Sequence, residues 1–71
     1  MNNARLTVVN NVRRLLREKG VKQGHIAKQI GVSEKEMSRI LSEGRPQPEH
    51  RIAAFAEALG VTVAELFEQP T

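Results

Sequence analysis

Residues 25–41, HIAKQIGVSEKEMSRIL, contain two short amphipathic runs with only Ile30-Gly31-Val32 between them. Glycine adopts the positive φ that ends a helix abruptly, so Gly31 is expected to close the first run. Ser33 to Glu36 fits a capping box, in which Ser33 accepts from the Glu36 amide and the Glu36 carboxylate reaches back. The pattern predicts helices over about 23–30 and 33–42, joined by a turn so short that they must cross steeply.

The rest of the chain also shows helical periods separated by glycine or proline. An apolar stripe spans residues 8–16, with arginines on its far side, and ends at Gly20. A loop over 44–48 precedes a helix over about 48–59, and a second capping box at residues 62–65 opens a short helix that ends near residue 67. No segment has strand periodicity and no internal repeat occurs, so the fold class is predicted to be all-α.

Length and composition exclude several classes of function. With 71 residues and no cysteine, the chain fits one domain over residues 1–71 without disulfides or thiolate metal sites. His25 and His50 are far apart and aspartate is absent, so neither a metal nor another cofactor is indicated. No nucleophile has a nearby base, which argues against an enzyme. No membrane span or signal-peptide core is visible, and a cytoplasmic location is expected.

The charge distribution favours a polyanionic partner. Residues 1–45 hold ten of the eleven Lys and Arg residues and four Glu residues, a net charge of +6. Residues 46–71 hold Arg51 and four Glu residues, a net charge of −3. Nucleic acid is the partner that such a basic end suggests, although an ordinary solvated surface is the alternative.

The run over 33–42 separates into two faces at about 100° per residue. Its apolar face comprises Met37, Ile40 and Leu41. The opposite face carries Lys35, Ser38, Arg39 and Ser42, with Glu34 and Glu36 on the flanks. A helix held outward with such a polar, cationic stripe fits the DNA major groove, which is about 12 Å wide.

Four segments together resemble the lambda-repressor and Cro-like helix-turn-helix family, also called XRE-like. They are RRLLREKGVKQ (13–23), HIAKQIGVS (25–33), MSRIL (37–41) and AEALGVTVAELF (56–67). The resemblance covers about residues 8–68, the expected ordered core, and places the helix-turn-helix at about 23–42. It implies a compact five-helix bundle that binds double-stranded operator DNA, commonly as a homodimer, and that regulates transcription as a repressor.

The resemblance also implies roles for individual residues. Gln23 looks like the residue that holds a backbone phosphate at the start of the second helix. The positions that read or approach base edges are occupied by Ser33, Glu34, Lys35, Ser38 and Arg39. Further phosphate contacts are implied for Ser42, Arg45, Arg13 and Arg14, the last two by a looser match. Arg39 is the favoured base reader, since bidentate arginine–guanine contacts are the commonest specific ones.

Three positions depart from the family pattern. Lys22 stands where a Ser or Thr cap is usual, so the phosphate clamp at Gln23 is in question. Glu34 replaces a neutral reader; it could accept from cytosine N4, stabilise the helix start, or repel phosphate. Residues 41–44 are one residue longer than usual, which leaves the reach of Arg45 open.

The two phenylalanines, Phe55 and Phe67, are expected in the core. An edge formed by Val63, Leu66 and Phe67 could instead face a second copy of the chain in a homodimer. The alternative function is an antitoxin-like interaction module that neutralises a protein partner and represses its own operon, with the acidic C-terminal half facing the partner.

Overall fold

The structure, a computed structural model, describes residues 4–44 and 47–68, with side chains from residue 7 onward. Its helices are α1 (Ala4–Lys19), α2 (Gln23–Ile30), α3 (Glu34–Glu43), α4 (Glu49–Leu59) and α5 (Val63–Leu66). The predicted all-α class is confirmed over these ranges. Helix α1 begins before the apolar stripe that predicted it. No described helix is both long and apolar enough to cross a lipid bilayer.

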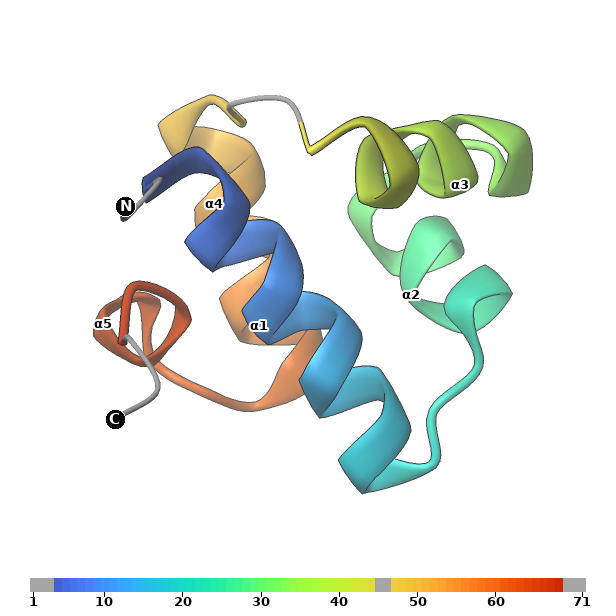
Figure 1. Cartoon of the computed structure of the whole chain (residues 1–71). Helices are drawn as coiled ribbons and strands as arrows, with labels where there is room; N and C mark the ends of the chain where they lie inside the picture. The colour runs from blue at the N-terminus through green and yellow to red at the C-terminus, as the bar shows by residue number, and fades with distance from the viewer. Residues whose placement is uncertain (1–3, 45–46, 69–71) are drawn as a thin grey trace.

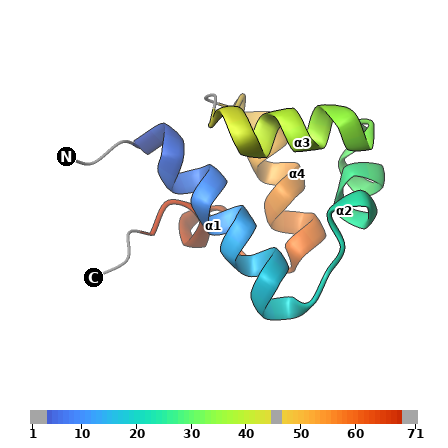
Figure 2. The ribbon, with the colours of Figure 1, turned by 45° about the vertical axis from the view of Figure 1, so that its right-hand side comes forward.

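Helices α3 and α5 lie at opposite ends of the molecule. Helices α1 and α4 pack together through the middle (Figure 1). Helix α3 packs on α1 and α2, whereas α5 packs on α1 and α4. In the turned view, α3 lies along an outer edge of the molecule, with α2 beside it (Figure 2). One side of α3 therefore faces away from the rest of the protein.

All five helices contribute to one hydrophobic core. Its buried side chains are Val8, Val9, Val12, Leu15, Leu16, Ile26, Ala27, Met37, Ile40, Leu41, Ile52, Phe55, Ala56, Leu59 and Leu66. The largest of those that are almost fully enclosed is Phe55, which is 1% exposed. Burying each large apolar side chain contributes about 1.5–3 kcal/mol. The stripes predicted for residues 8–16 and 33–42 are thus both core-facing.

Asn11 is a buried polar residue of α1 that hydrogen-bonds to the backbone at the C-terminal end of α5. Its Nδ2 donates to the carbonyl oxygens of Leu66 at 2.7 Å and Glu68 at 2.8 Å. Its Oδ1 accepts from Nη2 of Arg14 at 3.4 Å. These bonds satisfy carbonyls at the end of α5, where leaving a buried acceptor unpaired costs about 1–3 kcal/mol.

The structure corrects two expectations about α5. Leu66 is 0% exposed, so this core residue is not available for a dimer interface. Phe67, expected in the core, is 46% exposed, and Val63 is 42% exposed. The reason is the length of α5: a single turn of four residues turns only one of these three side chains fully inward.

Candidate nucleic-acid interface

The turn between α2 and α3 is fixed by backbone and capping hydrogen bonds. Gly31 has φ +82°, and the amide of Val32 donates to the Ala27 carbonyl at 2.9 Å. This is the pattern of a Schellman motif. The Ser33 hydroxyl then accepts from the Glu36 amide at 3.0 Å, which confirms the predicted cap. Helix α3 therefore starts at a defined residue and holds a defined orientation on α2.

The outer side of α3 is polar and exposed. Ser33, Glu34, Lys35, Ser38, Arg39 and Ser42 are all solvent-exposed. Met37, Ile40 and Leu41, on the opposite side, are 0%, 4% and 7% exposed. The buried face anchors the helix, and the exposed face is free to meet a ligand along its length.

Gln23 connects the start of α2 to the middle of α3. Its Nε2 donates to the Ser38 hydroxyl at 2.7 Å. The sequence predicts different roles for the two residues, one toward phosphate and one toward bases. The structure brings them together, so a ligand that engages one of them reaches the other.

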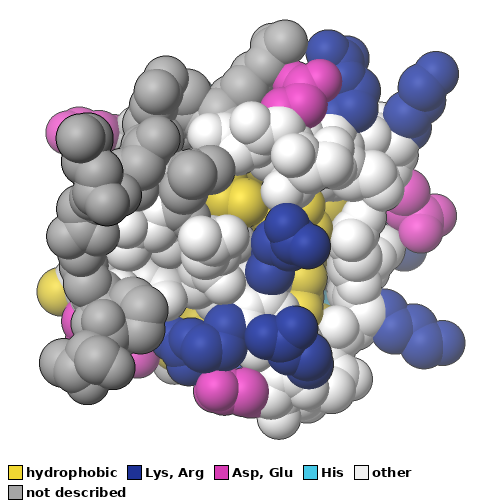
Figure 3. Space-filling view, viewed as in Figure 1, with side chains coloured by type: hydrophobic (Ala, Val, Ile, Leu, Met, Phe, Trp, Pro, Cys, Tyr) yellow, Lys and Arg dark blue, Asp and Glu magenta, His cyan; other side chains and the backbone are white. Residues whose placement is uncertain are grey.

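A hollow of about 620 Å³ lies beside this pair, between α1 and α3. It is lined by Arg13, Leu16, Arg17, Val21, Gln23, Ser38, Leu41 and Ser42. On the face shown in Figure 3, Lys and Arg side chains stand over this region, and apolar atoms are visible between them. Cationic and hydrogen-bonding groups around an open hollow are suited to a phosphate group.

Arg13 and Arg17 form the α1 side of this hollow. Arg13 Nη1 also donates to the Leu41 carbonyl, at 3.5 Å, near the C-terminal end of α3. Arg17 is not among the site residues predicted from the sequence. Arg17 follows Arg13 by four residues, so both lie on one side of α1. This spacing in the sequence could have identified Arg17 as a site residue.

Of the other predicted arginines, one lies apart from this arrangement and one is not described. Arg14 pairs with Glu18 at 3.0 Å and donates to Asn11, and it does not line the hollow. Arg45 lies outside the described residues. The predicted phosphate-binding set is therefore only partly assembled within the described residues, by Arg13, Gln23 and Ser42.

Glu34 lies against the first turn of α2. A Cβ built on Gly24 would be 2.5 Å from Glu34 Oε1, so a larger residue here would require the exposed Glu34 side chain to shift. The N-cap residue Lys22 makes no side-chain capping bond, and the first turn of α2 contains no acidic residue. A carboxylate close to that helix start is favoured by the helix dipole. The position of Glu34 is therefore consistent with the helix-start role among the alternatives predicted for it.

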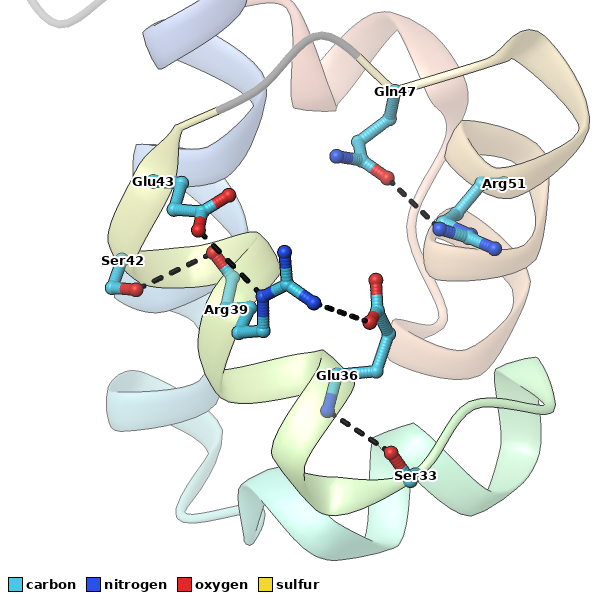
Figure 4. Close-up of polar contacts among 7 residues, drawn as sticks. All are labelled: Ser33, Glu36, Arg39, Ser42, Glu43, Gln47 and Arg51. Atoms are coloured by element: carbon cyan, nitrogen blue, oxygen red, sulfur yellow. Dashed lines mark hydrogen bonds and ion pairs between the residues drawn. The ribbon is translucent and has the colours of Figure 1, made fainter.

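The prediction that Glu36 completes a reciprocal capping box is wrong. The Glu36 carboxylate instead lies 3.7 Å from Nη1 of Arg39. The Glu43 carboxylate lies 3.6 Å from Nε of the same arginine. Figure 4 shows the guanidinium of Arg39 between these two side chains. The Glu36 carboxylate thus lies toward Arg39, one helical turn further along α3.

Comparison with known families identifies this arrangement. Residues 10–68 match the sequence model of a family described as a helix-turn-helix domain. The chain belongs to the helix-turn-helix domain family. In this domain, α2 and α3 are the two helices of the motif, and the five-helix fold implied by the family resemblance is confirmed. A comparison with curated proteins gave no significant match.

Two solved structures have the same fold as this helix-turn-helix domain. One is a hypothetical transcription factor, NHTF, from Neisseria, with a TM-score of 0.83 and 26% sequence identity. The match covers 96% of this chain and 78% of that chain. The other is the clp gene regulator ClgR from C. glutamicum, with a TM-score of 0.82 and 23% identity over 93% of this chain and 86% of that one.

Proposed function

We propose that this helix-turn-helix domain is a sequence-specific, double-stranded DNA-binding regulator of transcription. The observation that carries the proposal is the exposed polar face of α3, which is backed by three buried apolar residues on the same helix. The family match and the similarity to the hypothetical transcription factor NHTF from Neisseria support it. An α-helix fits the major groove, where each base pair presents a distinct pattern of donors and acceptors.

In this proposal, Arg39 and Lys35 contact base edges, with Arg39 bidentate to a guanine. Ser33 and Ser38 assist from the same helix. Glu34 is the weakest member of the reading set, because its carboxylate lies against α2.

Phosphate contacts come from the hollow between α1 and α3. Gln23 and Ser42 lie on one side of it and Arg13 and Arg17 on the other. Such contacts set the position of the protein on the duplex without reading sequence. Arg45, next to the end of α3 in the sequence, is proposed as a further phosphate contact. Arg14 is proposed only as a peripheral one, since it already pairs with Glu18.

The proposal includes a homodimer that represses from a palindromic operator. One chain offers one reading helix, and the longest dimension of the whole molecule is 31 Å. Two half-sites on one side of the duplex are about 34–36 Å apart, so a second copy is needed to read both. Val63 of α5 and the adjoining Phe67 are exposed at the end of the molecule opposite α3, and they are the proposed contact (Figure 1). The same surface would suit the protein partner that the antitoxin alternative requires.

Selection from random duplex DNA tests this function directly. The expected product is a motif of two inverted half-sites, with centres about 10 base pairs apart. The observed association constant should fall steeply as salt rises, because phosphate contacts release counterions. Failure to enrich any motif, with equally weak binding to all duplexes, would contradict a sequence-specific regulator and favour the interaction module.

A further inference from the structure

Arg39 is held from both sides by acidic residues of its own helix. Glu36 precedes it by three residues and Glu43 follows it by four, spacings that bring side chains together on an α-helix. The separations of 3.7 and 3.6 Å exceed hydrogen-bonding range, so charge attraction holds the guanidinium here. The side chain of Arg39 stays 53% exposed between the two carboxylates and is open to a ligand (Figure 4).

The two ion pairs leave part of the guanidinium available. They involve Nη1 and Nε, whereas Nη2 has no ion pair within the described part of the chain. Arginine has five N–H donors, and a bidentate contact to guanine needs two of them. The hydrogens of Nη1 and Nη2 can donate to a base while both carboxylates keep their places.

We propose that Glu36 and Glu43 are positioning residues that hold Arg39 for base reading. This inference rests on the proposed DNA-reading function of α3. A base contact made in the held conformation keeps both ion pairs. A guanidinium that swings away to reach a backbone phosphate must give them up. The pairs therefore favour the contact that depends on sequence over the contact that does not.

The surroundings of the pairs are consistent with a carboxylate close to DNA. Glu36, Arg39 and Glu43 line a hollow of about 180 Å³ that Arg51 of α4 also lines. Arg51 Nη1 donates to Gln47 Oε1 at 3.4 Å. A second cation beside the two acids reduces their repulsion of an approaching phosphate.

The test compares base discrimination in Glu36→Gln, Glu43→Gln and the double variant. Discrimination is the Kd for the selected site with the base pair read by Arg39 replaced, divided by the Kd for the selected site itself. It is expected to fall by up to about fivefold for each ion pair removed, the upper range for exposed pairs. Glu49→Gln, an exposed acid in the first turn of α4, removes the same charge and is expected to leave the ratio unchanged.

The same substitutions in an Arg39→Ala background separate positioning from plain charge repulsion. Positioning predicts that the effect on the ratio disappears when Arg39 is absent. An equal effect of the glutamine substitutions in the Arg39→Ala background would overturn the inference. So would a double variant, with Arg39 present, that keeps the ratio unchanged although Arg39→Ala abolishes discrimination. If Arg39→Ala leaves discrimination intact, the proposed reading role of Arg39 fails, and this inference fails with it.

Discussion

Replacing Arg39 with alanine is expected to weaken binding to the selected DNA site by about 1–3 kcal/mol, roughly tenfold to a hundredfold. The physical reason is the loss of a bidentate donor pair at one guanine. The loss should be confined to that base position, since the rest of α3 keeps its exposed face. Titration of fluorescent duplexes that differ at single base pairs measures both the affinity and the relaxed position.

Two further variants separate base reading from charge. Arg39→Lys keeps the positive charge but removes the planar guanidinium with its paired N–H donors. The variant should therefore still bind DNA but lose discrimination at the same base position. Lys28→Ala removes one positive charge from α2 and leaves the residues of α3 unchanged. It should weaken binding to all DNA sequences alike. Full discrimination by Arg39→Lys would show that Arg39 does not read a guanine bidentately.

Replacing Phe55 with alanine is expected to lower the free energy of unfolding by about 3–5 kcal/mol. Phe55 is 1% exposed in the centre of α4, so the substitution leaves a cavity in the core of a small domain. Such a loss is a large part of the stability of a single domain, which is about 5–15 kcal/mol. Urea denaturation followed by circular dichroism measures it.

Phe67 provides the matched control, because it is the other phenylalanine and is 46% exposed. Phe67→Ala should change the unfolding free energy of the monomer by less than about 1 kcal/mol. If Phe67 lies in the proposed dimer contact, the same substitution should weaken self-association in analytical ultracentrifugation. If both substitutions lower the unfolding free energy of the monomer equally, Phe55 does not stabilise the core more than Phe67 does, contrary to their burial.

The local signals in the sequence were sufficient for most of the fold. The helix bounds followed from residues that act on their own backbone, such as Gly31, with its positive φ, and Ser33, whose hydroxyl meets an amide three residues on. The buried side of α3 followed from periodicity, since only one face of a helix can reach the core. Each of these effects lies within one or two helical turns.

Contacts that depend on tertiary packing were not predictable in this way. Asn11 bonds to carbonyls 55 and 57 residues away, and no local pattern marks it. The bond between Gln23 and Ser38 needs the crossing geometry of two helices. Glu36 had two competing partners within reach, a backbone amide and Arg39, and the sequence does not rank them.

In the proposed complex, the outer face of α3 contacts nucleotides in the major groove. Titration of the ¹⁵N-labelled protein with a selected duplex, followed by amide NMR shifts, tests it most directly. We expect the largest changes in residues 33–42 and in Gln23, and the smallest in residues 63–66 of α5 at constant oligomeric state. Changes concentrated on α5, with α3 unaffected, would contradict it.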